Sequence, residues 1–308
     1  MNKHKITMLI IAFFWLLLAI FASLFFIRLL TGRSCPLSLK SRFSGNVKNL
    51  SVEEYQFDVE DISELSLELI SESIDLTKSS DNFIHVRVSS SLPEAERAVP
   101  RIKDHVLEIK RNKPKTRFFT FYAFKESVEV AIPESLMLKK DFLIQAFSTS
   151  GSISMSDMSA SEIFAYSTSG SIRAKNVNAK KFDFKSTSGS VKVEDSSCKN
   201  AALHSTSGSI VFEGSANEAD LRSTSGSVNA VFLEMPKKDS RFASTSGSVR
   251  LSLPENEGFD FHYSTISGSV RNEFTDFRGK KSGVNRYKDG GIAFDLTSTS
   301  GSVRIERN

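Results

Sequence analysis

The sequence predicts an all-β fold, a single stack of parallel strands wound as a β-solenoid with about 19–21 residues per coil. Two observations support this prediction: one turn motif recurs at a nearly fixed interval, and the residues on either side of it alternate between apolar and polar. The motif is Ser-Thr-Ser-Gly, nearly always followed by Ser and then Ile or Val, and its glycines are Gly151, Gly170, Gly189, Gly208, Gly226, Gly247, Gly268 and Gly301. Successive glycines are 19, 19, 19, 18, 21, 21 and 33 residues apart, as expected when each coil stacks on the last.

The residues next to each turn predict two strands per coil, each with one buried face. In the third copy Phe182 and Phe184 precede the turn, Val191 and Val193 follow it, and polar residues alternate with both pairs. Equivalent residues of stacked parallel coils should lie about 4.8 Å apart. We expect right-handed winding, because parallel β crossovers nearly always have that hand. We also expect each turn glycine to adopt a positive φ.

The glycine, rather than the first Ser, sets the register of each copy. Residues 264–268 read Ser-Thr-Ile-Ser-Gly, as though one residue had been inserted. Aligned on Gly268, the inward positions are Phe261 and Tyr263, and Ile266 takes the usual Thr position. The Thr residues of the other copies should form a column whose hydroxyls hydrogen-bond along the stack. Because no His and Asp are paired with them, we interpret these hydroxyls as structural rather than nucleophilic.

An uncharged apolar stretch near the amino terminus predicts one transmembrane helix. Residues 6–27 are long enough to span a bilayer, which favours a retained signal-anchor over a cleaved signal peptide. Residues 1–5 precede this span, and the polar, basic residues 28–50 form a juxtamembrane linker. Basic residues lie on both sides, so the positive-inside rule does not fix the orientation. We expect the solenoid on the extracytoplasmic side, because an N-terminal anchor before a large soluble domain is usually an export signal.

The rest of the chain, residues 51–308, is assigned to the solenoid. Residues 51–133 are strand-like but irregular, and we interpret them as degenerate amino-terminal coils and a cap over the open end of the core. Within them, residues 111–125 interleave basic and aromatic residues; such a pattern can bind nucleic acid or a membrane, but a strand pair in the cap is the preferred interpretation. Residues 134–308 hold the regular repeats. An insertion near residues 275–291 should emerge as a loop or hairpin between the last two coils.

The sequence offers no feature of a cofactor site. Cys35 and Cys198 are too few for a disulfide framework, and they lie in different regions of the chain. No metal-ligand cluster, phosphate-binding loop or nucleotide fingerprint is present in the sequence. We therefore expect no cofactor, no metal and no nucleic-acid partner.

A column rich in cations is predicted three residues after each glycine, on the outward side of the second strand. Its members in chain order are Ser154, Arg173, Lys192, Val211, Asn229, Arg250, Arg271 and Arg304. Five of these eight residues are cationic and none is acidic, and like charges at this spacing repel unless counterions or an anionic partner neutralise them. One interpretation is a solvated face balanced by neighbouring glutamates. The other is a binding stripe for a repeating polyanion of the envelope, such as an anionic glycopolymer or lipid head groups.

The repeat, the anchor and the degenerate first coils together resemble a bacterial family, the β-strand-repeat domains labelled putative adhesin, whose function is unknown. The resemblance covers roughly residues 50–308 and rests on the Ser-Thr-Ser-Gly-Ser-Val/Ile repeats. It implies a cell-envelope β-solenoid of bacterial origin, in the cytoplasmic membrane through a single span. It brings no catalytic residues with it.

Three functions remain open at this point. The first is a non-enzymatic envelope protein that binds or scaffolds a polymer or protein partner, and it is the one we favour. The second is a polysaccharide-active β-helix enzyme, which needs carboxylates clustered on adjacent coils. Asp183 and Asp220 share an outward column but should be separated by Ala202, while Asp295 lies farther along and His262 stands alone. The third is a self-assembling filament, because the last coil ends at Asn308 without an obvious cap.

Overall fold

The computed structural model describes residues 50–111 and 126–308. The chain divides into two units, Met1–Lys48 and Asn49–Asn308, and the description below concerns the second. The predicted membrane anchor at residues 6–27 and nearly all of the basic-aromatic segment lie outside the described residues. Within the described ranges, no helix is long and apolar enough to cross a membrane.

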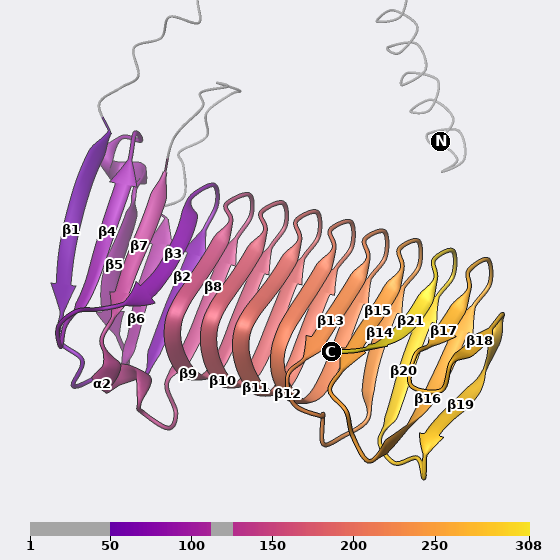
Figure 1. Cartoon of the computed structure of the whole chain (residues 1–308). Coiled ribbons are helices and arrows are strands. Elements are labelled where there is room, and N and C mark those ends of the chain that lie inside the picture. Colours follow the sequence, from indigo (N-terminus) through magenta and orange to yellow (C-terminus); the bar gives the residue numbers. More distant parts are fainter. Residues whose placement is uncertain (1–49, 112–125) are drawn as a thin grey trace, which may run out of the picture. The chain divides into compact units, whose positions relative to one another are not determined.

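The middle of the unit is the predicted parallel β-solenoid (Figure 1). Its four long strands are β9 (Ile153–Ser167), β10 (Ile172–Ser186), β11 (Val191–Ser205) and β12 (Ile210–Ser223). Each long strand carries the second half of one coil and the first half of the next, and a Ser-Gly turn links it to its successor. The pairing is parallel and keeps the glycine register, with Phe182 opposite Ala201 and Val191 opposite Ile210. The expected parallel, all-β stack is thereby confirmed; its handedness stays a prediction.

A second corner bends each long strand six residues after the turn glycine. Asp157, Asn176 and Asp195 adopt φ values of 56°, 53° and 50° there, and Gly214 takes a φ of 155° in the fourth copy. Asp, Asn and Gly tolerate a positive φ better than other residues. The sequence holds this signal at a fixed offset from the turn, but no corner was predicted at this position.

The expected positive φ at the turn glycines is wrong. None of the eight turn glycines belongs to the residues of positive φ. Glycine is required instead because the backbones of successive turns approach closely. A Cβ on Gly170 would lie 1.9 Å from the carbonyl oxygen of Gly151, and one on Gly189 would lie 2.1 Å from that of Gly170. Any side chain at these positions would push neighbouring coils apart.

The carboxyl-terminal coils do not stack in chain order. The strands of this region are β13 (Val228–Phe232), β14 (Ser240–Ser244), β15 (Val249–Leu253), β16 (Gly258–Thr265), β17 (Val270–Asn272), β18 (Phe277–Gly279), β19 (Ser282–Lys288), β20 (Ala293–Ser298) and β21 (Val303–Arg307). The coil formed by β20 and β21 pairs with β14 and β15 on one side and with β16 and β17 on the other. The turn order is therefore Gly247, Gly301, Gly268, as the contacts of each glycine with the previous carbonyl also show.

This interleaving corrects two expectations about the carboxyl-terminal end. The insertion after β17 does not emerge between the last two coils; it forms β18 and β19, which pair antiparallel with β17 and β16 and lie on the outer side of the terminal coil. The final residues of the chain do not form an uncapped end. They belong to an internal coil, because the long connection lets the chain return and fill the gap beside β15.

The amino-terminal end is interleaved in the same way. Its strands are β1 (Ser51–Phe57), β2 (Glu64–Leu69), β3 (Ser73–Lys78), β4 (Ile84–Ser90), β5 (Ala98–Lys103), β6 (Val106–Arg111), β7 (Ser127–Ile132) and β8 (Leu143–Ser148). Two short helical segments join them, η2 (Glu94–Glu96) and α2 (Glu134–Met137). The coil of β2 and β3 lies between the coil of β6 and β7 and that of β8 and β9. Antiparallel strands finish this end too: β5 on β6, and β4 on β7 followed by β1.

One continuous apolar core runs through the stack. The inward residues predicted from the alternation are buried, including Phe182, Phe184, Val191 and Val193, each with no exposed surface. Phe182 and Phe184 stack on one another with ring centroids 5.2 Å apart. The core is built from equivalent positions of successive coils, so it also holds the outward columns in register. Those columns carry the candidate site.

Candidate functional site

The first Ser of each turn motif is a structural residue. The hydroxyl of Ser186 donates to the carbonyl of Gly170 at 2.9 Å and accepts from the N–H of Gly189 at 2.9 Å. The same pair of bonds recurs in the neighbouring coils, and Thr265 makes it in the terminal coil. These hydroxyls are buried and fully engaged, so they are not available as nucleophiles.

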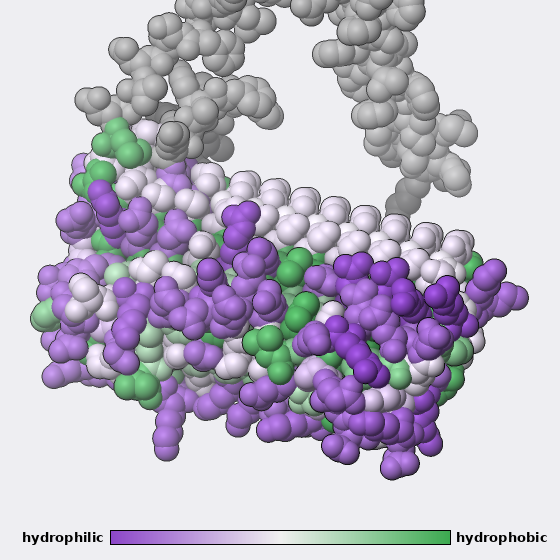
Figure 2. All heavy atoms as spheres, viewed as in Figure 1, coloured by the Kyte–Doolittle hydropathy of each residue, from purple (hydrophilic) through white to green (hydrophobic). Residues whose placement is uncertain are grey.

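The Thr and second Ser of each motif lie exposed at the tip of the turn. They form the regular, near-white edge of the stack in Figure 2. The Thr column was expected to form the hydroxyl ladder; the buried Ser beside it makes the repeated hydrogen bonds instead, and it makes them to backbone atoms. The Ile in the seventh copy fits this arrangement, because Ile266 is 77% exposed and needs no polar partner.

The predicted basic stripe is divided into two groups by the structure. Arg173 and Lys192 are neighbours on β10 and β11, and Val211 and Asn229 follow them. The second group begins with Arg250 on β15. All of these residues face outward from the second strand of their coils.

The second group is one residue longer than the sequence suggested. Arg250 pairs with Arg304, Arg304 pairs with Arg271, and Arg271 pairs with Arg278 on the antiparallel strand β18. Four arginines on successive strands thus lie side by side, at a spacing of about 4.8 Å. We call them the arginine row.

Two glutamates partly balance the arginine row. Glu306 lies 3.4 Å from Arg250 and 3.2 Å from Arg304, and Glu273 lies 3.4 Å from Arg271. The row therefore keeps an excess of positive charge. The side chains of Arg250 and Arg271 are 51% and 43% exposed, so solvent and a ligand can reach them.

Serine hydroxyls border the arginine row on the side away from the glutamates. Ser248, Ser302 and Ser269 occupy the position after each turn glycine, and the hydroxyls of Ser269 and Ser302 are 3.1 Å apart. Guanidinium groups beside hydroxyls offer several donors to phosphate or carboxylate oxygens. The arrangement suits an anion that repeats along the stack.

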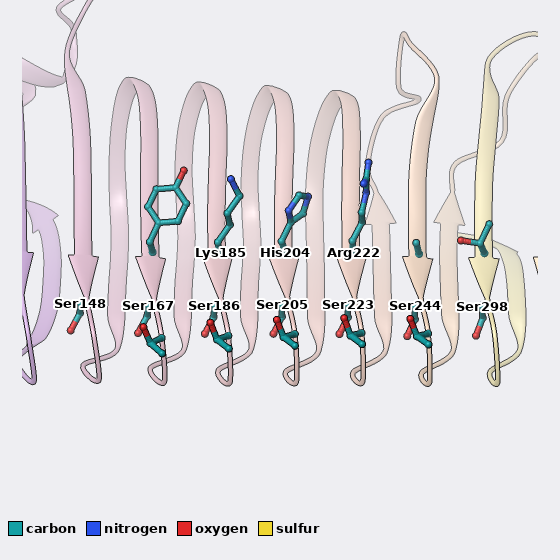
Figure 3. A pocket seen from close by; sticks show the side chains of 18 of the residues that line it. Ser148, Ser167, Lys185, Ser186, His204, Ser205, Arg222, Ser223, Ser244 and Ser298 are labelled. Carbon is teal, nitrogen blue, oxygen red and sulfur yellow. The ribbon is translucent and has the colours of Figure 1, made fainter. Parts of the chain in front are cut away.

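A shallow groove runs along the opposite strands, beside the turns (Figure 3). It encloses about 940 Å³, and its outward column begins with Phe147, Tyr166, Lys185, His204 and Arg222. The column then becomes small, ending with Ala243, Thr297 and Ser264.

The polar groups of the groove largely satisfy one another. The rings of Phe147 and Tyr166 stack with centroids 5.1 Å apart, and the Lys185 ammonium lies over the Tyr166 ring. Lys185 also pairs with Asp183 at 3.0 Å, and this ion pair helps raise the pKa of the Lys185 ammonium. Lys185 pairs with Asp183, and Arg222 pairs with Asp220. Because each of these cations has its own carboxylate partner, the groove carries less free charge than the arginine row.

The carboxylate column examined for catalysis contains no acidic pair. Asp183 and Asp220 flank Ala202, as the sequence predicted. The guanidinium of Arg222 donates to Asp220 at 2.5 Å. His204 and Arg222 keep the pKa of the Asp220 carboxyl below its ordinary value, although burial acts in the opposite direction. The interleaved coils do bring His262 and Asp295 together, with Nδ1 and Oδ1 3.1 Å apart, although the sequence left His262 alone. Both side chains are about half exposed, as is usual for a surface ion pair.

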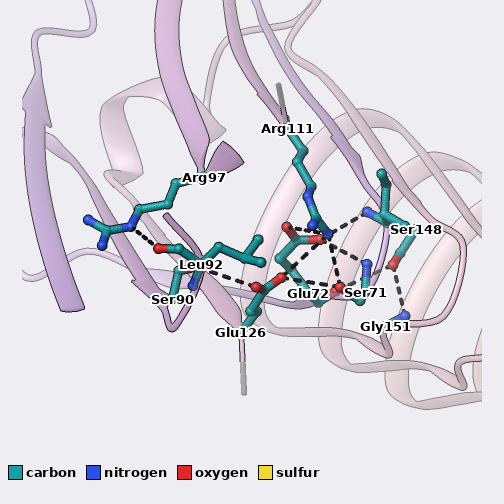
Figure 4. Close-up of polar contacts among 10 residues, drawn as sticks. Ser71, Glu72, Ser90, Leu92, Arg97, Arg111, Glu126, Ser148 and Gly151 are labelled. Atoms are coloured by element: carbon teal, nitrogen blue, oxygen red, sulfur yellow. Dashed lines mark hydrogen bonds and ion pairs between the residues drawn. The ribbon is translucent and has the colours of Figure 1, made fainter. Parts of the chain in front are cut away.

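A buried acidic pair lies at the amino-terminal end (Figure 4). Glu72 takes the place of a turn glycine in the β2–β3 coil, and Arg111 lies 3.6 Å from both Glu72 and Glu126. Ser71 donates to Glu126 at 3.2 Å. Burial and the neighbouring Glu72 carboxylate raise the pKa of Glu126. The cluster joins the terminal coils and is remote in the stack order from the arginine row.

Arg278 is the member of the site that sequence analysis missed. It lies outside the repeat register, in the segment expected to be a loop or hairpin, and only its pairing with Arg271 brings it into the row. The charge pattern of the insertion, rich in Lys and Arg, was a partial signal.

No group of His, Cys, Asp and Glu within the described ranges is arranged to hold a metal ion. Cys198 is buried, and burial raises the pKa of its thiol to about 12, so this cysteine is not a reactive thiolate at neutral pH.

Several solved structures are similar to this chain at low sequence identity. The chain is similar to a solved structure described as a putative adhesin from Parabacteroides merdae, with 16% identity and a TM-score of 0.47; the match covers 82% of this chain and 95% of that one. It is similar to a putative adhesin from Bacteroides fragilis, with 14% identity and a TM-score of 0.45, over 85% of this chain and 99% of that one. It is also similar to a putative lipid binding protein from Parabacteroides distasonis, with 12% identity and a TM-score of 0.48 over 82% and 96%. Comparison with curated proteins gives no match.

The model of the family described as Toastrack DUF4097 matches residues 62–306, which include both interleaved ends and all eight turn glycines. The chain belongs to the Toastrack DUF4097 family.

Proposed function

We propose that this chain is a non-enzymatic binding scaffold of a bacterial cell envelope. In this proposal residues 6–27 anchor it in the cytoplasmic membrane by a single span, and the solenoid lies on the extracytoplasmic side. The ligand is an anionic envelope polymer that runs along the stack and is bound by the cationic column, chiefly by the arginine row.

The observation that carries the proposal is the side-by-side arrangement of Arg250, Arg304, Arg271 and Arg278. Placing like charges on adjacent strands is unfavourable by a few tenths of a kcal/mol or more for each contact. Two glutamates offset only part of this repulsion. A polyanion relieves the rest, and its binding would be weakened by salt.

The chemistry of arginine favours phosphate or carboxylate groups as the recognised feature. Each guanidinium offers a planar fork of donors that can bind two oxygens at once. The spacing of about 4.8 Å between strands lets successive anionic groups of an extended polymer meet successive arginines. Arg173 and Lys192 extend the same column toward the other end and would hold a longer polymer.

The proposal is tested by equilibrium binding of the full-length chain in detergent to poly(glycerol phosphate) of defined length. We expect the triple variant Arg250→Ser, Arg271→Ser and Arg304→Ser to bind at least tenfold more weakly at low salt and to show a smaller salt dependence. Lys140→Ser, Lys199→Ser and Lys237→Ser together are the matched control, since these three lysines are exposed and lie outside the column. If the triple variant and the control bind equally, the arginine row is not the binding site.

A further inference from the structure

Each end of the stack finishes with one long strand whose outer edge is open. Among the described residues, β1 pairs only with β4, and β19 pairs only with β16. The other two terminal strands are poor edges for pairing, because β5 contains Pro100 and β18 has three residues. Figure 1 shows β1 at one end of the solenoid and β19 at the other.

The charges of the two open edges are opposite. Strand β1 carries Glu53 and Glu54 and no cation, whereas β19 carries Arg286 and Lys288 and no anion. Two β1 edges, or two β19 edges, would repel each other. A β1 edge facing a β19 edge would attract, so the charges select one pairing of ends over the others.

On each edge one charged side chain, Glu54 or Arg286, is accessible although it has a partner within the chain. Glu54 lies 3.7 Å from Arg87 with 75% of its side chain exposed, and Arg286 lies 2.6 Å from Asp260 with 62% exposed. Surface ion pairs of this kind contribute about 0–1 kcal/mol, so they do not prevent a second partner from binding.

Each open edge also exposes an apolar side chain. Val52 on β1 is 42% exposed, and Val284 on β19 is 63% exposed. Strand addition would bury both valines and would pair backbone groups that now face solvent.

We propose that a second copy of this chain docks its β1 edge against the β19 edge of the first. The two edges are at opposite ends of one rigid stack, so the contact is heterologous and leaves a free edge on each copy. Repetition of the contact builds a linear chain of solenoids.

The first test is sedimentation velocity of the full-length chain in detergent over a range of concentrations. We expect the chain to associate in a concentration-dependent way at about 0.05 M salt. The association constant should be at least tenfold lower at about 0.5 M salt. Glu54→Lys and Arg286→Glu should each weaken it at least tenfold. An equimolar mixture of the two variants should restore association, and so should the double variant, because in both cases an acidic side chain on one edge again meets a basic side chain on the other. Lys175→Glu, an exposed change in the middle of the stack, should have no effect.

The second test identifies the strands in contact. Copies with Val52→Cys are mixed with copies with Val284→Cys, both in a Cys35→Ser background, and treated with a short thiol cross-linker. The buried Cys198 should not react. Cross-linked dimers are expected in the mixture and not in either variant alone. A chain that stays monomeric at low salt, or that associates equally well in both single charge variants, would overturn the proposal.

Discussion

The middle of the solenoid and its two ends use the same coil but choose their neighbours differently. In the middle, each coil stacks on the one that precedes it in the chain, and β9 to β12 follow one another in space. At the carboxyl-terminal end a later coil is inserted out of order, and at the amino-terminal end an earlier one is. Antiparallel strands close the stack at both ends. The comparison teaches that the turn motif specifies a compatible neighbour, but not which coil that neighbour will be.

The functional consequence lies at the carboxyl-terminal end. In the middle, the outward cationic column is interrupted by Val211 and Asn229. At the end, three successive coils each carry an arginine in this column, and the antiparallel strand β18 adds a fourth without a gap. Four predictions test this contrast, from the largest expected effect to the smallest.

A charge in the core should cost more in the middle than at the end. Val191→Asp places a carboxylate where the side chain has no exposed surface, and we expect a loss of at least about 4 kcal/mol in the free energy of unfolding. Val270→Asp, in the terminal coil, should cost less, because one end coil can fray while the others stay folded. Denaturant unfolding measures both. Lys175→Asp is the exposed control, and an unchanged melt for Val191→Asp would refute its inward assignment.

Adding a methyl group to a turn glycine should cost about 3 kcal/mol at either place. In Gly189→Ala the new Cβ would meet the carbonyl of Gly170, and in Gly268→Ala it would lie 2.0 Å from the carbonyl of Gly301. Thermal unfolding of the two variants gives the comparison, with the exposed Ser188→Ala as control. Full tolerance of Gly268→Ala would mean that this glycine does not pack against the coil of Gly301.

Removing one buried turn hydroxyl should cost about 1–3 kcal/mol, because a backbone donor and an acceptor lose their partner. Ser186→Ala tests the middle, and Thr265→Ala tests the terminal coil, where the hydroxyl donates to Gly301 at 3.0 Å. Thr187→Ala changes an exposed hydroxyl of the same turn and should leave the unfolding midpoint within error. Equal effects of Ser186→Ala and Thr187→Ala would contradict the assigned roles.

The acidic pair should make the amino-terminal end less stable as pH rises. Burial and Glu72 hold the pKa of Glu126 above its ordinary value of 4.5. The folded state therefore binds the proton of Glu126 more tightly than the unfolded state does. The stability that comes from this tighter binding is fully present below the unfolded pKa and is lost as pH rises through the folded pKa.

Glu126→Gln should remove this pH dependence and stabilise the end by about 1 kcal/mol at neutral pH. Hydrogen exchange of β6 and β7, compared with β11 as an internal reference, measures it between about pH 4 and pH 8. If the hydrogen-exchange protection of β6 in the unmodified chain rose with pH, the pH dependence would have the opposite sign to the one predicted, and the explanation would be rejected.

The sequence predicts the coil well because its constraints are local. The alternation around Phe182 and Val191 identifies the buried faces, and the glycine alignment of the seventh copy correctly places Thr265 opposite Ser298. The sequence correctly predicts glycine at each turn but not its cause. A positive φ and a close approach between backbones both select glycine, and here the close approach is the cause. Only the positions of neighbouring carbonyls separate the two causes.

The order of the terminal coils could not be predicted in this way. The coils of Gly247, Gly268 and Gly301 present similar inward residues, so each can pack against either of the others. The 33-residue step before Gly301 allows the chain to return, but it does not specify where. Arg173 and Lys192 could therefore be placed from the repeat alone, and Arg271 beside Arg304 as well. The contact between Arg250 and Arg304 and the addition of Arg278 depend on tertiary pairing.

The coil order is the central claim of this account, and disulfide trapping tests it most directly. Neighbouring strands lie about 4.8 Å apart, within reach of a disulfide, and residues two coils apart lie about 10 Å apart, beyond it. In a Cys35→Ser background, Arg250→Cys with Arg304→Cys should cross-link on mild oxidation, and Arg250→Cys with Arg271→Cys should not. Efficient cross-linking of the second pair and none of the first would show that the coils stack in chain order, with Arg250 beside Arg271 rather than beside Arg304.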